Sequence, residues 1–594
     1  MTPTRHSALP RNNTDPTTNT SKDAHEAVIK VSESVIYSTI LPHTAEAGDP
    51  YYIGDAYSEY PLDISREWEI NSTNAPYLAH VKSLSSAWPS LRYLADFMEV
   101  STTPVRWKFL RENEAERQDR CNRTNITILD FDLSGNSTCK RFTDIDELEA
   151  ELRCKENGNP DKGSLRLFVV EDLSRGVIET LGSKFDIDPT FFRSHIDDYS
   201  WYNIRDRWMD PPTLKARSKH QNWTQIRFVR PRYFKTRESF QKGRDESNRF
   251  NVFRRPDDDQ NQWPYMDGDA VVGITRTKIS MWISKYDSLD SGVTGMVLVD
   301  PTVKQGFPLW HGYQNWAPIP GMHETASPPS GAPRISLFED VIYWILKYPW
   351  SPSLSETTYL QNLPIIMQPI LYLTCAEWLI ICQYIKSRLG QIEWELSNPS
   401  EFYKDTYIID KSLERLHTWR RHIPFYREIL TETLRSAGPT PMDSRHPSTA
   451  ASIGFCHVHS KSTGDSSHQE LAQMIFPEDI TPDIEEVIRQ MSELQERTDR
   501  LTAMVVAAIS IADSHRSLEE SRNVARLTWL ATIFIPLSFI TGFFSMQEDI
   551  TKLRVTFGWY FACAIPVTVL TLSIVVIARY QVGRKAEGIK KTSA

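Results

Sequence analysis

The sequence predicts an α+β soluble domain, then a long helical stalk, then a C-terminal hairpin of two transmembrane helices. Three observations carry this prediction. Short β-branched and aromatic runs alternate with helical patterns in the first half of the chain. An amphipathic pattern without Gly or a further Pro runs over 482–526. Two charge-free apolar segments follow it, at 527–546 and 555–578, and each is long enough to cross a bilayer.

Composition narrows the class of protein. The chain has 594 residues, 67 Lys and Arg against 76 Asp and Glu, and a net charge of -9. Its mean hydropathy of -0.42 excludes a chain that lies mainly in lipid, and the absence of a basic domain argues against a nucleic-acid partner. Seven cysteines are too few and too scattered for a disulfide framework, which indicates a reducing compartment. The first 25 residues are polar and do not resemble a signal peptide.

Shifts in composition and pattern divide the chain into ten segments. We expect a poorly ordered N-terminal region, an α/β cytosolic domain, a loop, a helical part of that domain, a flexible linker, the stalk helix, the first span, a short extracytosolic loop, the second span and a basic cytosolic tail. In that order the segments are 1–60, 61–312, 313–334, 335–436, 437–470, 471–526, 527–546, 547–554, 555–578 and 579–594.

Five segments of the α/β domain have the composition of strands, and a helical pattern follows one of them from Ser174 to Gly182. The strands are predicted at 125–131, 165–170, 223–229, 270–274 and 293–299. A further apolar segment, Leu363 to Ile385, is long enough to suggest a membrane span. It contains Glu377 and two prolines and continues into basic residues, so we interpret it as a core helix.

The stalk begins with helix-starting signals at Thr481 and Pro482. Apolar or small residues then recur three and four positions apart, which forms a heptad seam of positions 484, 487, 491, 494, 498, 501, 505, 508 and 512. A seam of this kind needs a partner. We expect the partner to be another subunit in a coiled coil, and the pattern leaves open a helix that packs on its own domain.

The two spans are joined by only eight residues, so they form an antiparallel hairpin. Aromatic residues gather at the ends that face this loop, as in an interfacial belt. Basic residues are concentrated before the first span and after the second, which places both termini in the cytosol, or in the matrix if the membrane is mitochondrial. Because two helices cannot enclose a water path, conduction would require an oligomer.

The segment Ala531 to Gln547, which reads ATIFIPLSFITGFFSMQ, closely resembles the first transmembrane helix of CorA-type divalent-cation transporters. The resemblance implies a funnel-shaped homopentamer in which the first span lines the pore and the second faces lipid. It implies Mg²⁺ as the transported ion and leaves Co²⁺, Ni²⁺ and Zn²⁺ open. The family signature Gly-Met-Asn is replaced here by Ser545-Met546-Gln547, in which Gln547 keeps the amide oxygen on a longer arm.

One face of the first span is formed by residues three or four apart. We predict that this face lines the pore; its residues are Val524, Leu527, Ala531, Ile535, Ser538, Gly542 and Ser545. Its apolar middle and small polar end suit a constriction that gates by wetting. Ordinary packing between spans is the alternative, because it favours the same small residues. Pro536 predicts a kink and frees a backbone carbonyl.

Candidate ion-binding residues outside this face are few. Glu548 and Asp549 follow the signature, and a ring of such carboxylates would attract cations to the mouth; a plain solvated loop is the alternative. Cys456, His457, His459 and His468 lie in the Ser/Gly-rich linker and lack a second nearby Cys, so they fit a zinc site poorly. We find no catalytic motif, and we expect neither an enzyme nor a resident cofactor.

The sequence therefore predicts a divalent metal cation transporter or channel, with a membrane, divalent cations and copies of itself as partners. The alternative is a membrane-anchored sensing or binding protein that keeps the architecture without conducting. We expect the plasma membrane, with the vacuolar and mitochondrial inner membranes as alternatives.

Overall fold

The computed structural model divides into two compact units. The sheet unit comprises 1–393 and 415–499, and the hairpin unit comprises 394–414 and 500–594. The structure describes residues 74–101, 113–132, 136–154, 165–197, 214, 221–254, 256–258, 268–284, 293–312, 316, 321–323, 331–347, 363–397, 406–437, 480–546 and 553–592.

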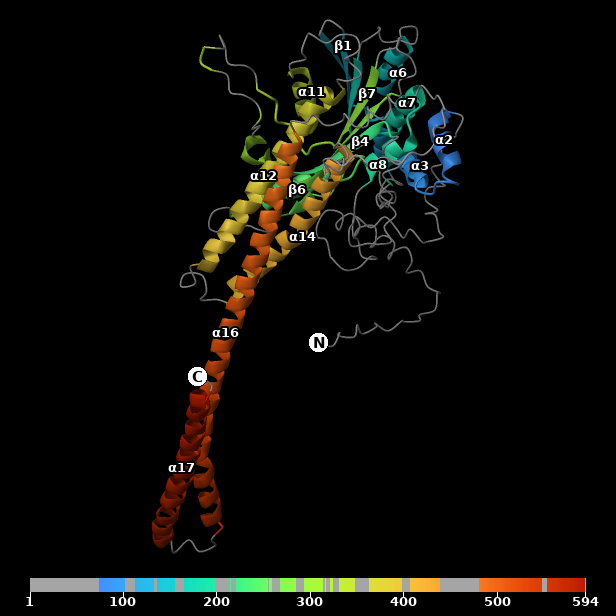
Figure 1. Ribbon diagram of the computed structural model, residues 1–594. Helices are drawn as coiled ribbons and strands as arrows, with labels where there is room; N and C mark the ends of the chain where they lie inside the picture. The colour runs from blue at the N-terminus through green and yellow to red at the C-terminus, as the bar shows by residue number, and fades with distance from the viewer. Residues whose placement is uncertain are drawn as a thin grey trace, which may run out of the picture. The chain divides into compact units, whose positions relative to one another are not determined.

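The sheet unit is built on one mixed sheet (Figure 1). Its strands are β1 (Ile126–Phe131), β2 (Ser137–Phe142), β3 (Leu165–Glu171), β4 (Trp223–Phe234), β5 (Pro256–Asp258), β6 (Val271–Ile283), β7 (Val293–Val299) and β8 (Phe307–Pro308). The order is β2-β1-β3-β7-β6-β4-β8, with β5 paired to β6. β3 and β7 run parallel, and the other described pairs are antiparallel.

Short helices pack around this sheet, and most of them contribute to its main apolar core. They are α2 (Pro76–Leu84), α3 (Leu91–Val100), α5 (Glu114–Asn122), α6 (Ile145–Cys154), α7 (Arg175–Phe185), α8 (Pro189–Ile196) and α10 (Arg237–Ser247). Local sequence starts several of them: the Ser174 side chain accepts a hydrogen bond from the Val177 amide, and Asp188 caps α8 ahead of Pro189. Phe168 from the sheet and Phe191 and Phe192 from α8 are fully buried in the resulting core.

Long helices pack on the sheet from other parts of the unit. α11 (Leu337–Lys347) follows the sheet, and α12 (Leu363–Ser397) and α14 (Thr406–Ala437) come after it. Arg230 of β4 pairs with Glu377 of α12 at 3.0 Å, and Arg227 of β4 pairs with Glu432 of α14 at 3.4 Å. These ion pairs tie the strand to both helices.

The structure confirms the α+β fold class and places a strand at each of the five predicted segments. β6 is much longer than predicted and continues to Ile283, while β2, β5 and β8 were missed because they are short, exposed or contain Pro. The interpretation of Leu363 to Ile385 as a core helix is also confirmed. Most apolar side chains of that segment, among them Ile370, Trp378 and Ile381, are buried.

The hairpin unit contains the two C-terminal helices. α16 (Thr481–Phe544) begins in the sheet unit and is one continuous helix through most of the first predicted span. α17 (Leu553–Thr592) contains the second predicted span and continues as a helix through most of the basic tail. The N-terminal region 1–60 and the linker 437–470 lie almost wholly outside the described residues, and only Ala437, the last residue of α14, is described.

Candidate functional site

The first half of the heptad seam on α16 is covered inside a single chain. Ile484, Val487, Met491 and Leu494 are all less than a tenth exposed. Helices α12 and α14 are the neighbours: Arg497 pairs with Glu393 of α12, and Asp499 lies 3.5 Å from Arg420 of α14.

The expectation that a partner subunit covers this seam was therefore wrong for its buried positions, which run from Ile484 to Val505. The sequence pattern shows that a helix face must be covered, and it does not show whether the covering helix belongs to the same chain. Farther along the seam, Leu501 and Val505 are buried, and Ala508 is half-buried.

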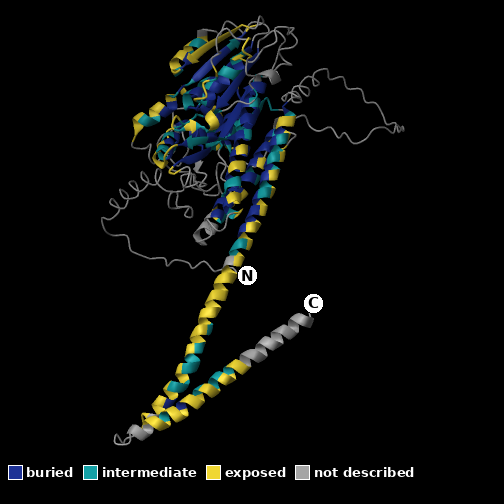
Figure 2. Cartoon of the chain, turned by 90° about the vertical axis from the view of Figure 1, so that its left-hand side faces the viewer, coloured by how far each residue is buried: buried dark blue, intermediate teal, exposed yellow. Residues whose placement is uncertain are grey.

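Exposure increases sharply along the rest of α16. Leu518 is 59% exposed and Leu530 is 53% exposed, and the two segments with the length and composition of membrane spans are each only 6% buried inside the chain (Figure 2). A core helix of a soluble protein would be mostly buried. Two apolar helices that their own chain leaves uncovered indicate a membrane protein with two spans.

The predicted pore face lies on the uncovered side of the first span, which it shares with Phe534 and Phe539. Val524, Leu527 and Ile535 are each more than 60% exposed, Ala531 is half-buried, and Ser538, Gly542 and Ser545 are exposed. A Cβ atom built on Gly542 would meet nothing within 4 Å. Nothing within the described chain therefore requires a small residue at Gly542.

The second span covers the opposite side of the first. Among the span residues whose burial is described, Ile540 of α16 and Ala564 of α17 are buried, and Thr541 Oγ1 lies 3.1 Å from the Tyr560 hydroxyl. At 100° per residue, Ile540 lies across the helix axis from the predicted pore face. The hairpin contact thus leaves that face free.

A proline interrupts the backbone hydrogen bonds at the middle of the first span without ending the helix. Pro536 lies inside α16, and the helix continues beyond it for eight residues to Phe544. Because Pro has no N–H, the Thr532 carbonyl lacks its usual helical donor. Nearby hydroxyls bond to their own helix: Thr532 donates to the Thr528 carbonyl at 2.7 Å, and Thr541 donates to the Leu537 carbonyl at 2.8 Å. These bonds satisfy hydroxyls in an apolar span.

The signature residues lie at the end of the helix. Ser545 and Met546 form a turn, in which the Ser545 amide donates to the Thr541 carbonyl at 2.9 Å. The first span is thus helical to Phe544, two residues short of the predicted end. Gln547, Glu548 and Asp549 lie outside the described residues, as do Cys456, His457, His459 and His468. Within the described ranges, no group of three His, Cys, Asp or Glu side chains is arranged to hold a metal ion.

A family comparison bears directly on this region. Residues 466–579 match the family model described as CorA-like Mg²⁺ transporter protein. The C-terminal segment of this chain is CorA-like. The CorA-like segment includes all of α16, the connection and the second predicted span, and it contains every residue of the predicted pore face.

Two solved structures are also similar to the chain. One is the complete structure of the CorA magnesium transporter from Methanocaldococcus jannaschii, at 10% identity and a TM-score of 0.36, covering 76% of this chain and 96% of that one. The other is the full-length CmaX protein, at 12% identity and a TM-score of 0.31, covering 77% of this chain and 98% of that one. No curated protein matches the sequence. At these identities and TM-scores, neither structural similarity assigns a function.

Proposed function

We propose that the protein is a divalent metal cation transporter or channel, with Mg²⁺ as its cargo. The observation that carries the proposal is the CorA-like segment at 466–579, which coincides with two spans that the chain leaves uncovered. The ion would move through a pore lined by the first span. Co²⁺, Ni²⁺ and Zn²⁺ are the competing cargoes.

The exposed face of α16 supports an oligomeric pore. One hairpin encloses no water path, so several copies must bring their uncovered faces together around an axis. The family resemblance makes a homopentamer the expected assembly. Ile535 and Leu527 would form apolar rings on such an axis, and Ser538 and Gly542 would form a stretch of small residues.

The proposed orientation places both termini in the cytosol. Arg516, Arg522 and Arg526 precede the first span, and Arg579, Arg584 and Lys585 follow the second. With this orientation a divalent cation entering the cell gains about 4.6 kcal/mol per 100 mV of negative-inside potential, twice the value for one charge. The membrane potential alone would drive uptake.

The decisive experiment is flux in liposomes. The full chain, reconstituted with a Mg²⁺-sensitive dye inside, should take up Mg²⁺ when a negative-inside potential is applied. Adding Zn²⁺ in competition would identify the preferred ion. Folded oligomers that carry no flux for any of the four cations would overturn the proposal.

A matched pair of substitutions tests which helix lines the pore. Ser538 on the first span and Ser573 on the second are both exposed in the chain. We expect Ser538→Leu to narrow the path and lower flux at least tenfold, and Ser573→Leu to leave flux nearly unchanged. Gln547→Ala should reduce flux or ion selectivity, while Phe561→Ala should matter less. Equal loss in the two serine variants would contradict a pore lined by α16.

The replacement of Gly-Met-Asn by Ser545-Met546-Gln547 favours a second candidate, a non-conducting membrane-anchored sensor or binding protein. Mg²⁺ gives up its water shell reluctantly, so the polar groups at a pore mouth must be placed to hold those waters. A longer side chain at Gln547 changes that placement. An assembled structure that is a dimer, or a ring sealed by side chains, would support the sensor.

A further inference from the structure

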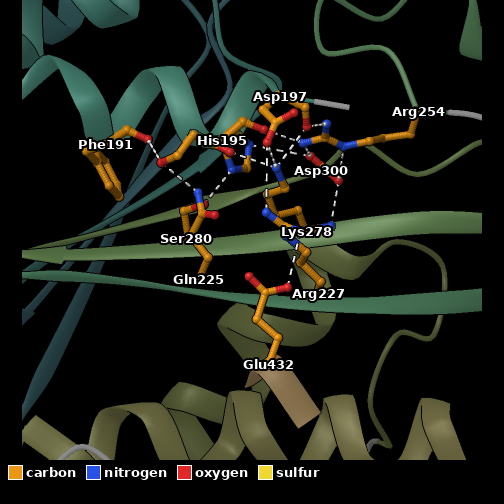
Figure 3. A network of polar contacts seen from close by, with 11 residues as sticks. Phe191, His195, Asp197, Gln225, Arg227, Arg254, Lys278, Ser280, Asp300 and Glu432 are labelled. Atoms are coloured by element: carbon orange, nitrogen blue, oxygen red, sulfur yellow. Dashed lines mark hydrogen bonds and ion pairs between the residues drawn. The ribbon is translucent and has the colours of Figure 1, made fainter. Parts of the chain in front are cut away.

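A buried polar cluster in the sheet unit surrounds Lys278, far along the chain from the CorA-like segment (Figure 3). Lys278 lies on β6 and is 5% exposed. Its Nζ donates to the carbonyls of Ser194 at 2.7 Å and Asp197 at 2.8 Å, both at the C-terminal end of α8. The Asp197 carboxylate lies 3.9 Å from the same nitrogen.

Three cations and three carboxylates meet in this cluster. Arg254 holds Asp300 through two contacts of 2.7 and 3.0 Å, and the Lys278 backbone amide donates to the same carboxylate. Arg227 lies between Asp197, at 3.8 Å, and Glu432 of α14, at 3.4 Å. Lys278 and Arg227 therefore share Asp197, and both approach its Oδ2 atom.

His195 is the remaining titratable group that faces Lys278, and it does not change charge near neutral pH. Its Nδ1 lies 2.9 Å from the Ser280 hydroxyl, and its Nε2 lies 3.4 Å from Asp300. Burial holds the pKa of His195 well below its usual range, and the charges of Arg254 and Lys278 act in the same direction.

Lys278 is the cation of this cluster that can lose its proton, because a guanidinium stays charged in proteins. Burial lowers the pKa of Lys278 to about 7; the Asp197 and Asp300 carboxylates oppose this shift, and Arg254 and Arg227 add to it. Its charge therefore changes across the neutral range.

Loss of that charge leaves two cations for three carboxylates. Asp197 and Glu432 then compete for Arg227. The side chain of Asp197 is 16% exposed and that of Glu432 is 54% exposed. Water can solvate Glu432 much better than Asp197, so an uncompensated charge costs more at Asp197. Arg227 should therefore move to Asp197.

We propose that this cluster is a pH-sensitive latch on helix α14. Protonated Lys278 neutralises Asp197 and leaves Arg227 on Glu432, which adds an ion pair to the apolar packing of α14. Neutral Lys278 draws Arg227 to Asp197 and loosens α14 around Glu432. This loosening can pass to α16, because Arg420 of α14 pairs with Asp499 of α16. Acidification would thus close the latch, and alkalinisation would open it.

Amide hydrogen exchange of the full chain in lipid nanodiscs tests the latch directly. After correction for intrinsic rates, peptides of α14 around Glu432 should open two- to fivefold more at about pH 8 than at about pH 6, the range that an exposed ion pair supplies. Glu432→Gln should give the faster rate at both pH values. Lys278→Met should do the same, because it removes the titrating charge.

Lys242→Met is the matched control. Lys242 pairs with Glu238 on α10 at 2.8 Å at the protein surface, and its loss should leave the pH response intact. Equal protection of wild-type α14 at both pH values would overturn the latch, and so would a wild-type pH response in Lys278→Met. If Lys278→Met does not fold, a full pH response in Glu432→Gln overturns the latch instead.

An effect of the latch on ion flux rests on the proposed function, whereas the exchange measurement needs no flux. A chain that shows pH-dependent exchange without transport would contradict only the proposed function. A chain that transports ions with α14 insensitive to pH would contradict only the latch.

Discussion

The sheet unit and the hairpin unit use apolar side chains in opposite ways. In the sheet unit, Phe168, Phe191 and Phe192 are fully buried. In the hairpin unit, Phe539 is 74% exposed and Ile535 is 67% exposed. The sheet unit thus covers its own apolar surface. The hairpin unit leaves a surface that only lipid or further copies of the chain can cover.

The two units also treat polar groups differently. The sheet unit buries charged side chains and pairs them, as with Arg254 and Asp300. The predicted spans carry no charged residue at all, and their hydroxyls return to the backbone of their own helix, as Thr568 does to the Ala564 carbonyl at 2.6 Å. We expect mutations and pH to act on the two units in correspondingly different ways.

The largest expected difference concerns matched phenylalanines. Phe168→Ala should destabilise the sheet unit by about 3–5 kcal/mol, because it removes a buried ring and leaves a cavity. Phe539→Ala should change the same free energy of unfolding by less than about 0.5 kcal/mol. Urea unfolding of the full chain in detergent, followed by circular dichroism, measures both. Similar losses would show that the hairpin face is covered as tightly as the core.

A glycine in each unit allows the same comparison of packing, with a smaller expected change in the free energy of unfolding. A Cβ at Gly182 would lie 2.8 Å from the Tyr77 ring, whereas a Cβ at Gly542 would meet nothing. Gly182→Ala should therefore cost about 1–3 kcal/mol in the same unfolding experiment. Gly542→Ala should not destabilise the chain, and any loss of flux in that variant would report close approach by a neighbouring copy. A neutral Gly182→Ala would contradict the close packing of α7 on α2.

Sensitivity to pH should be a property of the sheet unit. Burial raises the pKa of Glu171 from 4.5 to about 7, and a hydrogen bond from Asn125 opposes the shift. The folded state thus keeps a proton that the unfolded state has lost, so this contribution to stability is lost as pH rises from about 4.5 to about 7. Glu171→Gln should be more stable relative to wild type at about pH 8 than at about pH 4.5, by roughly 3 kcal/mol.

Unfolding at the two pH values measures this difference directly. A relative stability of Glu171→Gln that does not change with pH would contradict a protonated Glu171 in the folded chain.

The smallest effect is expected inside the hairpin. Tyr560→Phe removes the contact between the Tyr560 hydroxyl and Thr541 and should weaken the hairpin by only about 0.6 kcal/mol, as for other hydrogen bonds between spans. Trp559→Phe, at an exposed position, is the control. Both can be measured by SDS titration in mixed micelles. A loss above about 2 kcal/mol would mean that this single contact holds the spans together.

Much of the fold could be predicted because its signals are local. The strand at Leu165 to Glu171 and the helix start at Ser174 follow from residue types within a few positions. The spans follow from length and the absence of charge. The latch around Lys278 could not be found this way, because its members come from β4, β6, α8, α14 and two loops that are distant in sequence. The spacing of these residues in the sequence therefore does not predict that they form a cluster.

The sequence by itself determined the α+β class, the stalk helix, the two spans and the grouping of residues on the face that is proposed to line a pore. Each of these depends on periodicity or apolar length, which neighbouring residues set. Tertiary structure alone decided what covers each face. It placed α12 and α14 against the first half of the heptad seam, put α17 against Ile540, and left the side of Ser538 and Gly542 uncovered. A periodic pattern predicts that one face of a helix is buried. Only the packing in three dimensions shows which helix, subunit or lipid covers that face.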